Sequence, residues 1–146
     1  MNRGYMVSDL LLQCSTPLAS INERIMRLDV NTNLGTMTLL SIYRPTVNYS
    51  KQQKDEFNSQ LEQIIKKVPT SNRLTVLNDF SGHVGKDLVH CRHITGKYGT
   101  GSLNENGQCV LELCASSELI VSNVYFAGSS CTNVTCQDTG ISLTSS

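Results

Sequence analysis

The amino-acid sequence predicts an α/β (α+β) fold, a partial layered β-sandwich in which helices flank a mixed β-sheet. Strand and helix patterns follow each other in the order β-β-α-β-loop-α-β, which suits layers better than a doubly wound parallel sheet. The chain has 146 residues, of which 39% are hydrophobic and 16% charged. Such a chain is long enough for one globular domain with a core of its own.

The first two strands are predicted to form an antiparallel hairpin. Residues 26–30 alternate between apolar and polar side chains, the period-two pattern of a half-buried strand. Residues 31–35 supply turn-forming Asn, Thr and Gly, and a second β-rich run follows at residues 37–43. Pro45 ends that run, because proline has no N–H to donate to a neighbouring strand.

A helix is predicted after this hairpin. Ser50 suits its N-cap, acidic residues lie early, lysines lie late, and Pro69 ends it. Apolar residues recur at helical spacing on one face: Phe57, Leu61, Ile64, Ile65 and Val68. The apolar run from Leu74 to Asp79 is bounded by turn signals and predicts a buried strand.

The remaining sequence predicts one more helix, one more strand and a tail. A glycine-rich loop at residues 96–101 leads to a helix over residues 107–116, with Asn106 as its cap. Leu119 to Phe126 is predicted as the final strand. Residues 127–146 are rich in Ser, Thr and Gly without periodicity, so we expect a domain over residues 4–126 and an unstructured tail over 127–146.

Charge and cysteine content bear on the class of protein. Twelve basic and twelve acidic residues give zero formal net charge, which withholds support for nucleic-acid binding but leaves room for a local basic patch. The six cysteines form no C-x-x-C pair, and Cys109 and Cys114 fit as apolar fillers of the second predicted helix. No stretch suits a membrane span or signal peptide, so we expect an intracellular protein, nuclear or cytoplasmic, without membrane contact.

The cluster His90-Cys91-Arg92-His93 brings three candidate zinc ligands close together in the sequence. No fourth ligand follows at the spacing of a zinc finger. We therefore favour a solvated loop at this position and assign no metal ligand.

Asp79 stands at the end of the predicted buried strand, directly before a glycine-containing turn. Open α/β sheets place ligands and catalytic groups beyond the carboxyl ends of their strands. A carboxylate at that position holds a hard metal ion or accepts a proton from water. The alternative is that Asp79 caps the turn that follows it, as Asp commonly does.

The segment from residue 78 to 85, Asn-Asp-Phe-Ser-Gly-His-Val-Gly, resembles the Gly-Asp-Phe-Asn-x-x-Val-Gly motif of the endonuclease/exonuclease/phosphatase superfamily. Asn78 stands where the family has Gly, and Ser81 stands where it has a catalytic Asn. The resemblance is closest to the branch that contains craniofacial development protein 2-like proteins and the endonuclease domains of LINE-type retroelements. Four further segments also match the pattern of this branch and occur along the chain in the same order as in the family: residues 22–25, 41–46, 66–69 and 104–107.

The resemblance implies hydrolysis of phosphodiesters in nucleic acid with Mg²⁺ or Mn²⁺. It makes Asp79 a general base or water-orienting acceptor. It makes Tyr43 a phosphate contact, with a core aromatic whose hydroxyl reaches solvent as the alternative. Ser81 lacks the reach and the amide donor of the Asn it replaces. Asn104 and Asn106 precede a helix N-terminus, which favours anions, and are candidate substrate-binding residues; for Asn106 the alternative is helix capping.

Part of the family's catalytic set has no match in this sequence. The early strands with the metal-binding Asn and Glu, and the segment with the late Asp/His pair, are not matched. We therefore expect a truncated member of the superfamily that is inactive or weakly active, with exposed strand edges that favour self-association. Two alternatives stay open: a non-catalytic interaction module that retains the scaffold, and a partial gene model.

Overall fold

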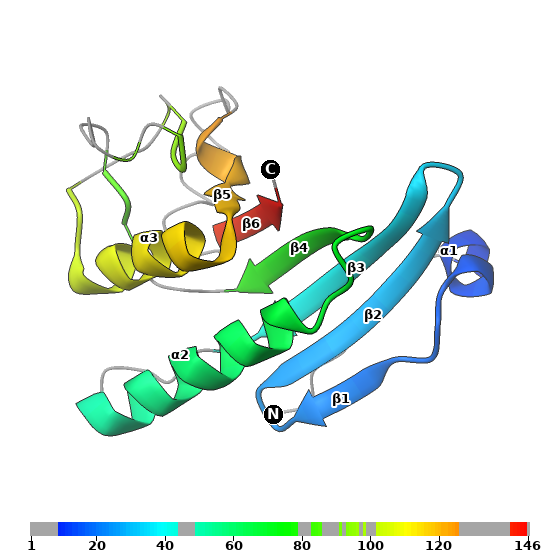
Figure 1. The fold of residues 1–146 in the computed structure, drawn as a ribbon, viewed down its shortest axis with the longest axis horizontal. Helices are drawn as coiled ribbons and strands as arrows, with labels where there is room; N and C mark the ends of the chain where they lie inside the picture. Colours follow the sequence, from blue (N-terminus) through cyan, green and yellow to red (C-terminus); the bar gives the residue numbers. More distant parts are fainter. Residues whose placement is uncertain are drawn as a thin grey trace.

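A six-stranded mixed sheet forms the centre of the computed structural model, with strand order β1-β2-β3-β4-β6-β5 (Figure 1). The structure describes residues 9–43, 49–78, 83–85, 91, 93–96, 98, 102–125 and 141–145. Its elements are α1 Asp9–Cys14, β1 Ala19–Asn22, β2 Ile25–Thr32, β3 Gly35–Ile42, α2 Lys51–Lys66, β4 Arg73–Asn78, α3 Glu105–Ser117, β5 Leu119–Val121, the 3-10 helix η2 Ser122–Val124, and β6 Ile141–Ser145. The predicted α+β fold with a mixed sheet and flanking helices is confirmed.

The predicted hairpin is formed by β2 and β3. The two strands are antiparallel, and their register runs from Ile25 opposite Ile42 to Thr32 opposite Gly35. The Thr32 hydroxyl donates to the Gly35 carbonyl at 2.7 Å and accepts from the Leu34 N–H at 3.2 Å. Gly35 has a φ of +112°, a backbone conformation that L side chains rarely adopt. Glycine is therefore needed where β3 begins.

The helix predicted after the hairpin is α2, and Ser50 caps it as expected. The Ser50 hydroxyl accepts from the Gln53 N–H, and the Gln53 side chain accepts from the Ser50 N–H. This reciprocal pair is a capping box, which satisfies two backbone donors at the start of the helix. Of the predicted apolar face, Phe57, Leu61 and Ile65 are buried within α2, Val68 is buried just after the helix ends, and Ile64 is partly buried.

The second predicted helix is α3, but its cap differs from the prediction. Asn104, not Asn106, is the N-cap, and its side chain accepts from the Gly107 N–H at 2.8 Å. The helix consequently begins at Glu105 and places Asn106 inside its first turn. Two asparagines stand close together in this segment, and sequence spacing alone does not decide which of them lies outside the helix.

The C-terminal part differs most from the prediction. The strand expected over residues 119–126 ends at Val121, because η2 follows and the Tyr125 N–H donates to the Ser122 carbonyl. The expectation of an unstructured tail is wrong for Ile141–Ser145, which form β6 between β4 and β5. A strand paired on both sides is stabilised by its neighbours, a long-range effect that local composition does not carry. Residues 126–140 lie outside the described part.

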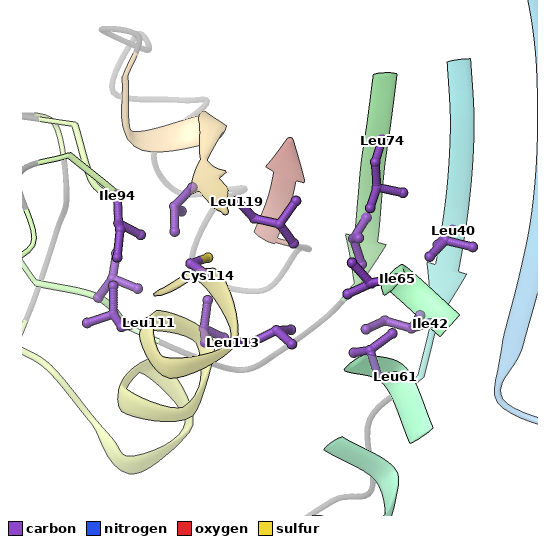
Figure 2. Packing of buried hydrophobic residues seen from close by; sticks show 14 of the residues in the cluster. Leu40, Ile42, Leu61, Ile65, Leu74, Ile94, Leu111, Leu113, Cys114 and Leu119 are labelled. Atoms are coloured by element: carbon purple, nitrogen blue, oxygen red, sulfur yellow. The ribbon is translucent and has the colours of Figure 1, made fainter. Parts of the chain in front are cut away.

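Helices α2 and α3 pack on one face of the sheet (Figure 1), and one cluster of buried residues lies between the helices and the strands. Figure 2 shows Leu61 and Ile65 of α2 beside β3 and β4, and Cys114 of α3 beside β5. The members from the strands are Ile25, Leu40, Ile42, Leu74, Val76, Leu119 and Val121. This core fixes the positions of the strand ends at which the candidate site lies.

Candidate active site

The carboxyl ends of β3 and β4 lie side by side, because the two strands run parallel. We call this end of the two strands the β3–β4 edge; it is distinct from the edge strands β1 and β5. Ile42, the last residue of β3, pairs with Asn78, the last residue of β4. Tyr43 and Asp79 directly follow these two residues in the sequence. Asp79 and Ser81 themselves lie outside the described residues, so their roles stay predictions. The register nevertheless brings the chain to the same edge at both points.

Tyr43 lies beside the turn between β1 and β2. Its N–H donates to the Arg24 carbonyl at 2.9 Å. Its side chain is 37% exposed and is not a member of the buried cluster, which argues against the reading as a core aromatic. The phosphate contact that the resemblance implies stays a prediction.

Arg24 is a residue of this edge that the sequence did not single out. Its guanidinium lies 4.9 Å from the centre of the Tyr49 ring, and its Nη2 donates to the Tyr49 hydroxyl at 3.0 Å. Its Nε lies 3.4 Å from a carboxylate oxygen of Glu23. The hydrogen bond to Tyr49 raises the pKa of Arg24 despite partial burial. Arg24 and Tyr49 are far apart in the sequence, so the folded chain alone reveals the pair.

A polar cavity of about 290 Å³ adjoins this pair. It is lined from the β1–β2 turn by Asn22, Glu23 and Arg24, and from the other side by Tyr49, Gln53, Glu56, Phe57 and Gln60. The two glutamates offset the charge of Arg24. The cavity therefore offers amide and carboxylate groups but no excess of positive charge for a phosphate.

The side chain of Asn104, predicted to contact substrate, makes hydrogen bonds within the protein. Its Oδ1 accepts from the Gly107 N–H at 2.8 Å and from the His83 N–H at 3.0 Å. Both bonds are made within the protein, so this oxygen is engaged before any substrate arrives. Binding of substrate by Asn104 stays a prediction, and the geometry favours capping and loop attachment.

Asn106 lines a larger hollow of about 660 Å³ between the first turns of α2 and α3. Asn104 also borders it, and the other lining residues are Lys51, Lys54, Asp55, Asn58, Leu103, Glu105, Gln108 and Cys109. The positive charges of its two lysines are balanced by the negative charges of Asp55 and Glu105. The two asparagines predicted to bind substrate thus share one hollow, on the side of the sheet that carries the helices.

Metal-ligating residues do not converge within the described ranges: no three His, Cys, Asp or Glu side chains form a cluster there. Of the cluster at residues 90–93, the structure describes Cys91 and His93. Burial raises the pKa of the Cys114 thiol to about 12, consistent with its predicted role as an apolar filler. Among the same residues, no helix has the length and apolarity to cross a membrane.

Comparison with known proteins finds a distant and partial similarity. No protein-family model matches the chain. Craniofacial development protein 2 from Bos taurus is 25% identical over 105 residues, which cover 72% of this chain and 17% of that protein. Craniofacial development protein 2 from Tragulus javanicus is 24% identical over 105 residues, covering 72% of this chain and 18% of the relative. The matched region is thus under one fifth of either relative, and it agrees with the branch indicated by the sequence motifs.

Proposed function

We propose that this chain is a divergent segment of the Mg²⁺-dependent endonuclease/exonuclease/phosphatase scaffold. Its ancestral chemistry is phosphodiester hydrolysis on nucleic acid, and its own activity is low or absent. The observation that supports this most is the parallel register of Ile42 with Asn78, which puts Tyr43 and the start of the Asp79 segment at one sheet edge. The similarity to craniofacial development protein 2 supports the same family.

The chemistry assigned to each residue follows from its functional group. The Asp79 carboxylate orients a water molecule and accepts its proton, and the Tyr43 hydroxyl donates a hydrogen bond to a phosphate oxygen. Ser81 holds the substrate less well than Asn, because its hydroxyl is shorter and it has no amide donor. We expect this replacement to lower the rate roughly a hundredfold, as does loss of one preorganised donor.

A bound Mg²⁺ or Mn²⁺ supplies positive charge that stabilises the phosphate in the transition state. Mg²⁺ prefers oxygen ligands in octahedral geometry. The described residues bring no set of carboxylate, His or Cys side chains together for such an ion. We therefore assign no set of metal ligands to this chain.

The test is a nicking assay on supercoiled DNA with Mg²⁺, with EDTA in parallel, for the wild-type chain and Asp79→Asn. We expect a rate near background that falls to background in Asp79→Asn. Robust metal-dependent nicking by the wild-type chain would contradict the low or absent activity, and nicking unaffected by Asp79→Asn would contradict the role of Asp79.

A non-catalytic interaction module is the second candidate, and one observation favours it. The edge strand β1 and the residue before it expose two apolar side chains, with Leu18 47% and Ile21 42% exposed. Exposed apolar edge strands pair readily with further strands. If a partner binds through β1, we expect the Asp79→Asn variant to bind it as strongly as the wild type does in a pull-down. Loss of binding in Asp79→Asn would contradict this use of the edge strand.

A further inference from the structure

We infer that His93, Tyr98 and Tyr125, which we call the aromatic surface, bind unpaired nucleotides of a nucleic acid by stacking against their bases. The surface lies at the same end of the sheet as the β3–β4 edge. This inference rests on the proposed function, because that proposal makes nucleic acid the substrate, and it specifies which part of that substrate this surface holds.

The carboxyl ends of three strands lie at this end of the sheet. β5 runs parallel to β3 and β4, because β6 lies between β4 and β5 and is antiparallel to both. Through β6, the register places Leu40, Val76 and Val121 in one row across the sheet. The carboxyl end of β5, which η2 and Tyr125 follow, therefore lies three strand spacings, about 14 Å, from that of β3. Open α/β sheets bind their ligands beyond such carboxyl ends.

The backbone of the aromatic surface is held in place where β5 ends. The Tyr98 N–H donates to the Val124 carbonyl at 3.0 Å, and the Tyr125 hydroxyl donates to the His93 carbonyl at 3.1 Å. Between these bonds, a Cβ at Gly96 would lie 2.2 Å from the Val124 carbonyl oxygen and 2.5 Å from the Tyr125 Cα. The two backbone segments are therefore in direct contact, and the aromatic side chains are attached to a fixed support.

The same two segments bury their aliphatic side chains and expose their aromatic ones. Ile94 and Val124 belong to the buried cluster. Tyr98 is 38% exposed, Tyr125 is 37% exposed, and His93 is exposed as well. The core thus anchors these segments, while the aromatic rings face solvent.

Exposed aromatic rings on neighbouring, fixed backbone segments suit stacking with nucleobases. Every base has a flat π-face, so an aromatic side chain binds it with little dependence on sequence. Unstacked bases of a single strand are open to such contacts, whereas the bases of a duplex are stacked on one another. The rings therefore favour a single-stranded segment over a duplex.

The charge of this part of the sequence suits the phosphates of such a strand. Residues 88–104 include Arg92 and Lys97 but no Asp or Glu, and residues 119–137 carry no charged residue. The cavity beside Arg24 and the hollow between α2 and α3, in contrast, contain acids that offset their cations. A positive surplus attracts a phosphate backbone, which favours nucleic acid over a protein partner at the aromatic surface.

The test is binding of a fluorescein-labelled oligothymidylate of about 12 nucleotides, measured by fluorescence anisotropy in EDTA so that no metal-dependent hydrolysis occurs. Tyr98→Leu and Tyr125→Leu keep apolar bulk but remove the ring, and Tyr98→Phe keeps the ring. Leu34→Ala is the control, because Leu34 is 71% exposed at the amino end of β3, away from the aromatic surface. Tyr98→Leu decides alone if Tyr125→Leu, which also loses the bond to His93, does not fold.

We expect Tyr98→Leu and Tyr125→Leu each to weaken binding roughly tenfold, as for the loss of one base stacked on an aromatic ring. Tyr98→Phe and Leu34→Ala should bind as the wild type does, and a duplex of the same length should bind more weakly. Because the chain has no Trp, its tyrosine fluorescence reports stacking directly. The oligonucleotide should quench this fluorescence, and should quench it less in Tyr98→Phe.

Wild-type binding by both Leu variants would overturn the inference, and so would a duplex that binds as tightly as the single strand. Absence of binding to the oligonucleotide would also overturn it, and would leave a protein partner as the interpretation of the exposed rings. These measurements need no turnover. Nicking unaffected by Asp79→Asn would therefore contradict the proposed function without changing the binding results.

Discussion

Asp29 and Thr38 form the centre of a side-chain hydrogen-bond network that joins β2, β3 and the segment before β4. Arg27 Nη2 lies 2.8 Å from Asp29 Oδ2, and the Thr38 hydroxyl donates to Asp29 Oδ1 at 2.8 Å. Thr38 is fully buried and accepts from Asn72 Nδ2 at 3.1 Å. Burial by itself raises the pKa of Asp29, but the hydrogen bonds from Arg27 and Thr38 and the charge of Arg27 outweigh it, so the pKa is lowered.

The lowered pKa makes this contribution depend on pH. Stabilisation by Asp29 is fully present above its unfolded pKa of about 4 and is lost as the pH falls through the lower folded value. We expect Asp29→Asn to reduce the free energy of unfolding by about 1–3 kcal/mol near neutral pH. Urea denaturation across acid and neutral pH measures this. The control is Glu62→Gln, which breaks an exposed pair with Lys66 of 3.9 Å and should change little; an equal effect of both variants would refute the role of Asp29.

At the scale of the element, α2 contributes to the core through one face. Leu61 is completely buried, whereas Ile64 is only partly buried against the cluster. We expect Leu61→Ala to lower the free energy of unfolding by about 2–5 kcal/mol, because the cavity left behind cannot fully collapse. Ile64→Ala should cost clearly less. Chemical denaturation of both variants tests the assignment, and a larger loss for Ile64→Ala would show that the helix is rotated.

Local patterns predicted the elements that local forces determine. The period-two alternation at residues 26–30 and the helical spacing of Phe57, Leu61 and Ile65 each matched the structure, since both periods follow from backbone geometry. The N-cap of α3 was predicted at the wrong residue, because Asn104 and Asn106 have the same side chain. Only the folded structure shows that the Gly107 N–H donates to Asn104.

Features that depend on distant parts of the chain were missed. β6 exists because β4 and β5 flank it, and the Arg24–Tyr49 pair exists because the β1–β2 turn meets the chain before α2. The attachment of Asn104 to His83 belongs to the same class. For the candidate site, the sequence therefore predicted the two strands that lead to Tyr43 and Asp79, but not the residues that surround their ends. The roles of Tyr43 and Asp79 stay predictions.

For the whole molecule, the sheet has β1 at one edge and β5 at the other. Ile21 of β1 is 42% exposed on an edge strand. We expect the chain to self-associate at high concentration, and Ile21→Lys to weaken association by placing a charge on the edge. Leu34→Lys is the matched control, because Leu34 is 71% exposed at the hairpin tip, away from this edge. Sedimentation velocity measures the effect, and equal weakening by both variants would argue against pairing through β1.

The loss of Asn at position 81 is central to the proposed decline of a nuclease site at the β3–β4 edge. The most direct measurement is the Mg²⁺-dependent rate of hydrolysis of a phosphodiester reporter by Ser81→Asn, compared with the wild type and with Ser81→Asn combined with Asp79→Asn. We predict that Ser81→Asn raises the rate roughly a hundredfold and that adding Asp79→Asn returns it to background. A Ser81→Asn rate equal to that of the wild type, or a gain that survives Asp79→Asn, would contradict this assignment.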